Sequence, residues 1–330
     1  MSSSIRIAIV AAFLLPLLHS VADSASPLRP VNTYSIVARD TATGEMGVAV
    51  QSHWFSVGTI VSWADPGVGV VATQSLADPA YGPRGLSLMR SGKTATESLT
   101  SLLASDENSD VRQVAMIDAD GNVANHTGEK SIAEYCDYRG ENYSVQANMM
   151  WNPTVCTAMA EGFEQAQGDL ASRLLAALDA AESAGGDIRG KQSAALLVVS
   201  GDIAEPAWGG RVFDLRVEDH AEPLVELRRL VTLARAYRLM NAGDEHMTNG
   251  EIPDAVEAYS SAQSLVPDSH EMIFWHAVTM AAADDLDAAL PLFEKAFAAW
   301  PRWRELVQRL PAADLLPDDP ELMSRILAVD

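Results

Sequence analysis

The sequence has few basic residues, few cysteines and no long apolar run beyond its N-terminus. Its 23 Lys and Arg stand against 45 Asp and Glu, which gives a net charge of −22. Because like charges repel, this balance argues against nucleic acids and anionic lipid surfaces as partners. No low-complexity tract is present, and 48% of the 330 residues are hydrophobic. We therefore expect a chain that folds into one domain and a smaller second one.

The apolar run at the N-terminus decides the expected compartment. Arg6 precedes apolar residues 7–18, and small residues follow at 20–22, which is typical of a signal peptide. A buried N-terminal helix is the alternative. No cysteine follows the run, which argues against a lipid anchor, and no other stretch is long enough to cross a membrane. We predict a signal peptide over residues 1–22, a leader over 23–32, and a soluble protein that is periplasmic or secreted.

Two cysteines, Cys136 and Cys156, allow at most one internal disulfide. An exported protein can form that bond, whereas two separately buried thiols are the alternative. No histidine stands near them at the spacing of a zinc site. The sequence predicts neither a metal nor a cofactor.

Short β-rich runs and amphipathic segments follow the leader. We expect strands at residues 34–39, 47–51, 59–63, 69–73, 111–118, 122–127, 145–151, 193–200 and 211–217, and helices at 94–104, 154–166, 169–184 and 223–240. Strands and helices do not alternate strictly, which favours antiparallel sheets covered by helices over a doubly wound parallel sheet. The expected class is α+β, with a four-layer αββα sandwich over residues 33–235 as one such arrangement.

The C-terminal part of the chain repeats with a period of 34. Ala255 and Tyr259 recur as Ala289 and Phe293, and this spacing is typical of tetratricopeptide repeats. An ordinary helical tail is the alternative. We predict a small all-α, tetratricopeptide-like array with a capping helix over residues 236–330.

Six motifs carry a resemblance to a known family. They are TYSIVARD (33–40), GEMGVAVQS (44–52), GVGVVATQ (67–74), YGPRGL (81–86), GDIRGKQSA (186–194) and DLRVEDH (214–220). Over about residues 33–230 the chain resembles the bacterial family called domain of unknown function 1028. The resemblance implies a fold similar to that of N-terminal-nucleophile (Ntn) hydrolases and leaves the substrate open.

The same resemblance points to Thr33 as the catalytic residue. In the Ntn superfamily the first residue of the first strand is Thr, Ser or Cys, and its own α-amino group serves as the general base. Thr33 occupies that position and would be exposed by a cut after Asn32. This implies an exported hydrolase of amide bonds in a small-molecule or peptide substrate, such as a cell-wall fragment. Thr33 as a simple strand residue is the alternative.

A second function class is a non-catalytic periplasmic binding or scaffold protein. In that case the repeats would hold a protein partner in their groove. A homo-oligomer is compatible with either function.

Polar side chains at strand ends and in one dense loop are the candidate substrate-binding residues. They are Ser52, Gln74, Asn148, Asp187, Arg189, Gln192, Ser193, Asp214 and His220. Hydroxyl and amide groups there can donate to a developing oxyanion, and Arg189 can fork onto a carboxylate. Asp214 and His220 flank the last strand and could tune an acid–base pair. The alternative for all of them is that they satisfy loop backbone or lie at solvated strand ends.

Overall fold

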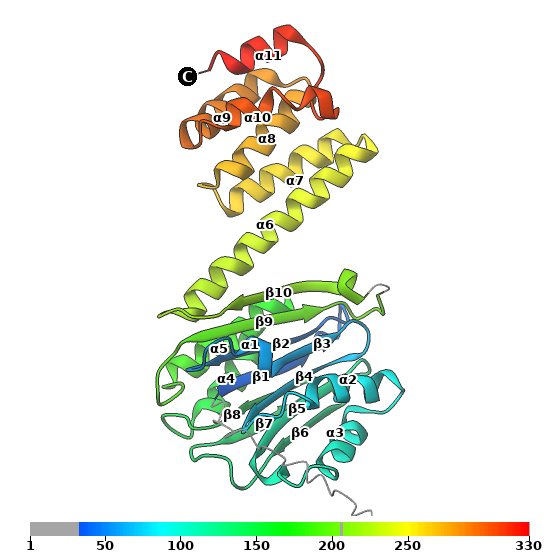
Figure 1. The fold of residues 1–330 in the computed structure, drawn as a ribbon, viewed down its shortest axis with the longest axis vertical. Coiled ribbons are helices and arrows are strands. Elements are labelled where there is room, and N and C mark those ends of the chain that lie inside the picture. The colour runs from blue at the N-terminus through cyan, green and yellow to red at the C-terminus, as the bar shows by residue number, and fades with distance from the viewer. Residues whose placement is uncertain (1–32, 205–206, 330) are drawn as a thin grey trace, which may run out of the picture.

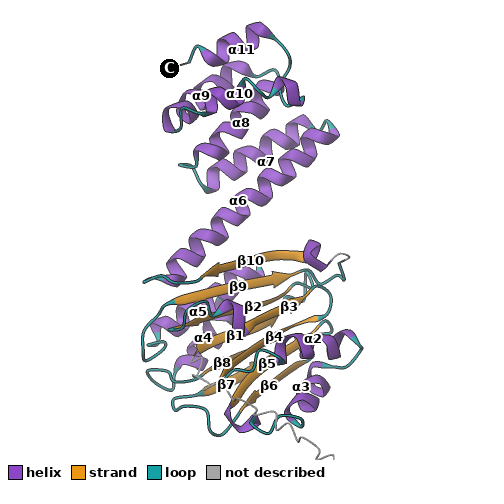
Figure 2. Ribbon diagram, viewed as in Figure 1, coloured by secondary structure: helices purple, strands orange, loops and turns teal. Residues whose placement is uncertain are grey.

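A computed structural model describes residues 33–204 and 207–329 (Figure 1). The predicted signal peptide (1–22) and leader (23–32) lie outside the described residues. The chain forms one part built of sheets and helices and a second part built of helices alone (Figure 2). In the described ranges no helix combines the length and the apolar character needed to cross a membrane.

The larger sheet has six strands, each antiparallel to its neighbours. Its order is β10 (Arg211–Val217), β9 (Ser193–Val199), β2 (Met46–Ser52), β1 (Thr33–Arg39), β8 (Tyr143–Ala147) and β7 (Cys136–Gly140). Strand β1 is therefore central, and its residues from Thr33 to Ala38 are all buried. Its β-branched and aromatic residues suit such a strand.

The smaller sheet has four antiparallel strands and stacks face to face on the larger one. Its order is β3 (Ser62–Asp65), β4 (Gly69–Ser75), β5 (Arg112–Asp118) and β6 (Val123–Thr127). Small and β-branched side chains fill the space between the sheets as one buried cluster, which includes Val37, Val48, Val50, Val70, Ala72 and Ala115. Such side chains allow two sheets to approach to about 10 Å.

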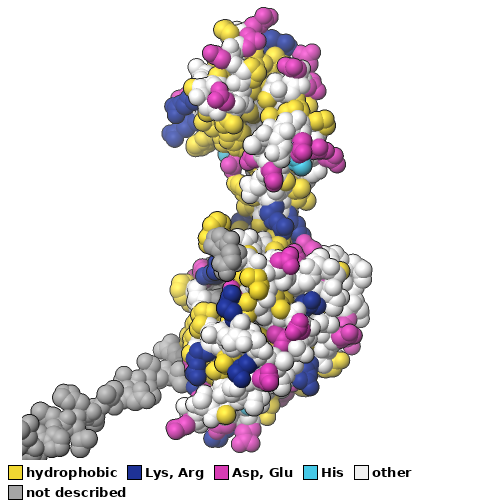
Figure 3. All heavy atoms as spheres, turned by 90° about the vertical axis from the view of Figure 1, so that its right-hand side faces the viewer, with side chains coloured by type: hydrophobic (Ala, Val, Ile, Leu, Met, Phe, Trp, Pro, Cys, Tyr) yellow, Lys and Arg dark blue, Asp and Glu magenta, His cyan; other side chains and the backbone are white. Residues whose placement is uncertain are grey.

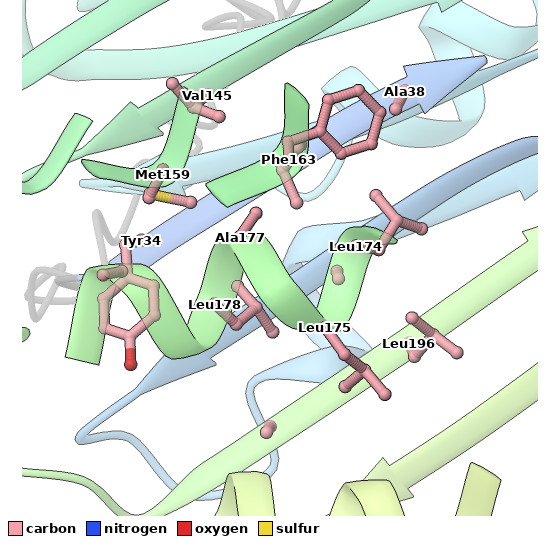
Figure 4. Close-up of a cluster of buried hydrophobic side chains, with 14 of the residues drawn as sticks. Tyr34, Ala38, Val145, Met159, Phe163, Leu174, Leu175, Ala177, Leu178 and Leu196 are labelled. Atoms are coloured by element: carbon pink, nitrogen blue, oxygen red, sulfur yellow. The ribbon is translucent and has the colours of Figure 1, made fainter. Parts of the chain in front are cut away.

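Helices cover the outer face of each sheet. The larger sheet carries α4 (Val155–Gln165) and α5 (Leu170–Ser183), and the smaller sheet carries α2 (Tyr81–Arg90) and α3 (Ala95–Leu103). The core under α4 and α5 includes Tyr34, Val145, Met159, Phe163, Leu174, Leu178 and Leu196 (Figure 4). Antiparallel sheets with helices packed on them confirm the α+β class.

The strand predicted at residues 59–63 is wrong. The chain instead forms the short helix α1 (Gly58–Val61) before β3 begins at Ser62. The β-branched residues of this segment favour a strand by propensity, but Val57 and Val61 pack into the cluster between the sheets. Tertiary packing thus overrides local preference here.

Helix α2 was not expected, because its sequence contains two glycines and a proline, which are poor helix formers. Packing requires the first glycine and favours the second. A Cβ at Gly82 would lie 2.2 Å from the Trp63 ring, and one at Gly85 would lie 2.8 Å from Met116 Cε. The helix therefore gains close contact with the smaller sheet at a cost in intrinsic helix propensity. Strand β7 was not expected either.

The helical part contains six helices in the described range. They are α6 (Pro223–Asn249), α7 (Ile252–Leu265), α8 (His270–Ala282), α9 (Leu286–Ala299), α10 (Trp303–Val307) and α11 (Pro320–Leu327). Helices α7 and α9 have 14 residues each and begin 34 positions apart. Ala255 and Tyr259 of α7, and Ala289 and Phe293 of α9, are buried. The sequence period of 34 therefore corresponds to one antiparallel helix pair.

Helix α6 connects the two parts without interruption. We predicted that it ends at residue 240, but it continues to Asn249. Gly243 lies inside this helix, and a Cβ at this position would lie 2.6 Å from the Tyr259 ring of α7. Glycine is thus needed for the close approach of α7.

The two halves of α6 belong to different cores. Leu224, Leu227 and Val231 pack with α5, β9 and β10, whereas Ala236 and Met240 pack with α7 and α8. The predicted domain boundary between residues 235 and 236 therefore falls inside one helix. Basic side chains gather at this neck (Figure 3).

A disulfide joins Cys136 and Cys156, so the structure adopts the first of the two alternatives for these residues. It fastens the edge strand β7 to the covering helix α4. The two cysteines are 20 residues apart. Linking them restricts the unfolded chain and thereby stabilises the folded one.

Amide side chains link the two sheets at the end where β1 begins. Gln74 of β4 accepts a hydrogen bond from the Ser35 hydroxyl (2.6 Å) and donates to Gln113 Oε1 (2.7 Å) and to the carbonyl oxygen of Thr33 (3.2 Å). Gln113 Nε2 in turn donates to the carbonyl oxygen of Ala147 (3.0 Å). All these side chains are fully buried.

Strand β8 contributes two more side chains to this amide network. Gln146 Nε2 donates to the Ser35 hydroxyl (2.6 Å), and Asn148 Nδ2, just beyond β8, donates to Gln113 Oε1 (2.9 Å). Buried amides stabilise a fold only when most of their hydrogen bonds are made. The amide network therefore fixes how the two sheets meet at this end.

We expect removal of the disulfide to lower the free energy of unfolding by about 3 kcal/mol, the typical effect for a loop of this length. Urea unfolding of a variant with both cysteines replaced by Ala measures it. Wild-type protein treated with a reductant should show the same loss, and the variant should not respond to reductant. Equal stability of oxidised and reduced wild-type protein would contradict the prediction.

We expect Gln74→Leu to destabilise the fold by about 2 kcal/mol, because Ser35 loses its acceptor and several buried groups lose a donor. The matched control is Gln165→Leu, an exposed position of α4, which should change stability by no more than about 0.5 kcal/mol. Chemical denaturation of both variants checks the difference. If both variants unfold at the wild-type denaturant concentration, the amide network does not hold the sheets together.

Candidate functional site

Three hydroxyl-bearing residues stand side by side at one end of the larger sheet. Thr33 of β1 pairs with Ser52 of β2, and Ser52 pairs with Ser193 of β9. All three are fully buried. Side chains alternate between the faces of a strand, and Ser35, two residues from Thr33, reaches Gln74 between the sheets. The Thr33 side chain therefore lies on the same face, between the sheets.

Gln74 and Asn148 bring amide groups to the same place. The carbonyl oxygen of Thr33 accepts hydrogen bonds from the backbone N–H of Asn148 (3.1 Å) and from Gln74 Nε2 (3.2 Å). We call Thr33, Ser52, Gln74, Asn148 and Ser193 the strand-end site. The sequence predicted these five residues separately, and the structure brings them together.

The hydroxyl of Ser193 has a structural role within this site. It accepts a hydrogen bond from the Val57 N–H (3.1 Å) and donates one to the carbonyl oxygen of Trp54. Both bonds hold the segment that follows β2. Ser193 therefore shapes the wall of the site instead of offering a free nucleophile.

Asp187 and Arg189 form an ion pair beside the strand-end site. Arg189 Nε and Nη2 donate to the two oxygens of Asp187 at 3.0 and 2.6 Å, and the backbone N–H of His53 donates to Asp187 Oδ2 (3.1 Å). The Asp187 side chain is fully buried. Arg189 therefore makes a bidentate contact with a carboxylate, but this carboxylate is that of Asp187 and not of a substrate. The pair ties the loop before β9 to the end of β2.

A second polar cluster lies on the helix-covered face of the larger sheet, and the sequence analysis missed it. Glu182 Oε2, in the last turn of α5, accepts from the Tyr34 hydroxyl (2.8 Å) and from Gln51 Nε2 (2.9 Å). Burial, and then the neighbouring Glu182, raises the pKa of Tyr34 well above its usual value. Tyr34 therefore stays protonated and donates. A glutamate in the last turn of a helix is unfavourable because of the helix dipole. This unusual position could have marked Glu182 in the sequence as a residue with a specific partner.

Two buried amide oxygens, one on each face of the larger sheet, have no hydrogen-bond partner among the described residues. They are Asn148 Oδ1 and Gln51 Oε1. Asn148 donates its backbone N–H to Thr33, and Gln51 pairs with Tyr34, the next residue of β1. Unsatisfied buried acceptors are rare in folded proteins, and a catalytic role is one explanation for them. This end of β1 therefore has hydrogen-bonding capacity that the fold itself does not use.

The remaining predicted site residues lie progressively farther out. Gln192 borders the strand-end site, since its N–H donates to the carbonyl oxygen of Ser52 (3.1 Å). His220 is exposed, donates its N–H to the carbonyl oxygen of Gln192 and accepts at Nδ1 from the Glu222 N–H (2.9 Å). The two are thus adjacent to the site without reaching Thr33 in any described contact.

Asp214 does not join the site. It lies in the middle of the edge strand β10, which β9 and β2 separate from β1. Its carboxylate pairs with Arg211 and Arg216 of the same strand. The structure therefore supports the alternative for this residue, a solvated group on a strand. It cannot tune His220 or bind substrate near Thr33 from this position.

In the described ranges one set of side chains could share a metal ion, and it lies elsewhere. It consists of His246, Glu251 and Asp254, at the turn between α6 and α7. His246 Nδ1 is 2.6 Å from Glu251 Oε2, so the cluster already satisfies itself as an ion pair. In the described part of the chain, no identified contact joins this cluster to the strand-end site.

The part of the chain that carries the strand-end site is shared with other proteins. A crystal structure of a protein from Silicibacter pomeroyi, assigned to the family DUF1028, matches with a TM-score of 0.56 and 31% sequence identity. The match covers 62% of this chain and 86% of that one. Among curated proteins no significant match was found.

The family model extends over the entire sheet-containing part. It is described as "Family of unknown function (DUF1028)" and matches residues 33–227. It therefore begins at Thr33 itself and ends in the first turns of α6. The helical part lies beyond it. Since the match covers more than half of the sequence, the chain belongs to the DUF1028 family.

Proposed function

We propose that the protein is an exported hydrolase of amide bonds in which Thr33, freed by a cut after Asn32, is both nucleophile and general base. The observation that carries the proposal is the position of Thr33. It is the first residue of the central strand β1 and lies between the sheets among groups from both of them. A cut after Asn32 would place a free amine at this point.

The chemistry needs no other base. An α-amino group has a pKa of about 7.7–8.0 and is largely able to accept a proton near neutral pH. The Thr33 hydroxyl oxygen attacks the amide carbon while its proton passes to the Thr33 amine. The C–N bond breaks, the leaving amine takes the proton, and the acyl group remains on Thr33 as an ester. Water then cleaves the ester and restores the hydroxyl.

The residues around Thr33 fit supporting roles in this reaction. Asn148 donates its backbone N–H to Thr33, and its unused side-chain oxygen could accept a hydrogen bond from the ammonium form of the Thr33 amine. Ser52, the cross-strand partner of Thr33, carries a hydroxyl on the same face of the sheet. Such donors at a strand end suit a developing oxyanion. The Asp187–Arg189 pair fixes the neighbouring loop.

Exposed apolar side chains beside this loop suggest a substrate with an apolar group near the scissile bond. Trp151 and Ile188 are 65% and 51% exposed. Trp151 donates its N–H to the carbonyl oxygen of Gly186, and Ile188 follows Asp187 directly. Large exposed apolar side chains grouped in this way commonly contact a ligand. Peptides and cell-wall fragments with apolar side chains fit this description.

Three features support the finer assignments of fold and compartment. Two antiparallel sheets stacked between helices support a relationship to Ntn hydrolases. The Cys136–Cys156 disulfide supports export to a periplasmic or extracellular location, because such bonds persist in oxidising compartments. The helical part, with its 34-residue period, supports a short tetratricopeptide-like array.

We expect purified active protein to contain chains that begin at Thr33, which intact mass spectrometry shows directly. In a chain made with Met before Thr33, so that Met removal exposes it, Thr33→Ala should lower amide hydrolysis by about a thousandfold or more. Thr33→Ser should retain part of the activity, because oxygen and amine both remain. Thr100→Ala, an exposed helical threonine, is the matched control. Full activity in chains that still carry residues 23–32 would disprove the proposal and favour a scaffold role.

We also expect kcat/KM to rise with pH through about 7.7–8.0. Below that range the Thr33 amine is protonated and cannot accept the hydroxyl proton; above it the amine is neutral and competent. A pH profile with the best amide substrate from a screen measures this. A profile that stays flat across this range would contradict the Thr33 amine as the base.

A further inference from the structure

A cavity of about 820 Å³ lies in the helical part of the chain. Helices α6, α7 and α8 line one side of it, and the segment between α10 and α11 closes the other. Apolar and aromatic side chains form its floor, and three aspartates line its rim. This volume lies within the range of small-molecule sites, which is about 300–1,000 Å³. The cavity lies beyond residues 33–227, the part that the family shares.

The floor of this cavity is apolar and firmly packed. Met240, Tyr259, Val278 and Leu316 are each less than 8% exposed, and they come from three helices and the closing segment. Trp275 of α8 is half-buried beside them. The cavity thus offers an aromatic and aliphatic surface that is already formed without a ligand.

The rim of the cavity is acidic. Three carboxylates, those of Asp244, Asp314 and Asp318, line it, and none of the lining residues is Lys or Arg. Asp244 accepts a hydrogen bond from the Tyr259 hydroxyl. Within the described residues none of the three carboxylates takes part in an ion pair. Residues 236–330 carry 17 Asp and Glu against six Lys and Arg, so the surrounding field is negative as well.

We propose that this cavity binds a small organic cation, an ammonium or guanidinium group attached to an apolar body. The apolar body would lie on the floor and the cation would face the three carboxylates. An aromatic ring such as that of Trp275 further favours a cation over a neutral group. Carboxylate or phosphate ligands are disfavoured, because the rim would repel them. The site is independent of the hydrolysis proposed for Thr33.

A matched series of probes tests the proposal on the full mature chain. Phenylbutylamine, phenylbutanol and phenylbutyrate share one apolar body and differ in the charge of the head group. Isothermal titration should show the amine binding more tightly than the alcohol and the alcohol more tightly than the acid. Raising the salt concentration should weaken the amine and leave the alcohol unchanged. Equal binding of amine and acid, or no measurable binding of the amine at millimolar concentration, would overturn the proposal.

Charge-removing variants locate the binding within the molecule. Asp314 has a left-handed backbone with φ of 58°, which asparagine adopts readily, so Asp314→Asn should fold normally. Combined with Asp318→Asn it should weaken amine binding by about fivefold and leave the alcohol unaffected. The matched control is Asp284→Asn, which also has a left-handed backbone, with φ of 62°, and does not line the cavity. An equal loss of amine binding in the control would show that general charge, and not this cavity, is responsible.

Discussion

The contact between the two sheets at the start of β1 is the constraint on which the candidate site depends. Elsewhere the sheets meet through valine and alanine, but here Gln74 and its partners replace that apolar layer with hydrogen bonds. Apolar packing tolerates small shifts, whereas lengthening any hydrogen bond of a buried amide network destabilises the fold. The position of Thr33 is therefore defined by directional bonds from both sheets. Such positioning is what a reacting group requires.

Much of the fold could be predicted from local sequence, and the reasons for the exceptions are physical. The hairpin around Asp120 and the helices α4 and α5 follow from turn chemistry and apolar periodicity, and the structure contains all of them. Helix α2 could not be predicted, because its glycines are selected by contacts with Trp63 and Met116 on distant strands. The strand prediction for residues 59–63 failed for a similar reason, since the packing of Val61 between the sheets outweighed the β-propensity of the segment.

The candidate site shows a similar division. Thr33, Ser52, Gln74, Asn148 and Ser193 were recognisable as polar groups at strand ends, but their convergence depends on the strand order. Gln113 and Glu182 escaped notice because their partners are far away in sequence, 39 residues for Gln74 and 148 for Tyr34. Asp214 looked equivalent to the others until the order β10-β9-β2-β1 placed it at the edge.

The number of residues in helix α6 determines how the helical part is oriented relative to the sheet-containing part. The helix has 27 residues and contributes to both cores without a break. Each residue of an α-helix adds about 1.5 Å along the helix axis and about 100° of rotation about that axis. One residue inserted near its middle would swing the whole helical part by more than a quarter turn and move it hardly at all. The orientation of the cavity relative to the strand-end site therefore depends on the number of residues in α6.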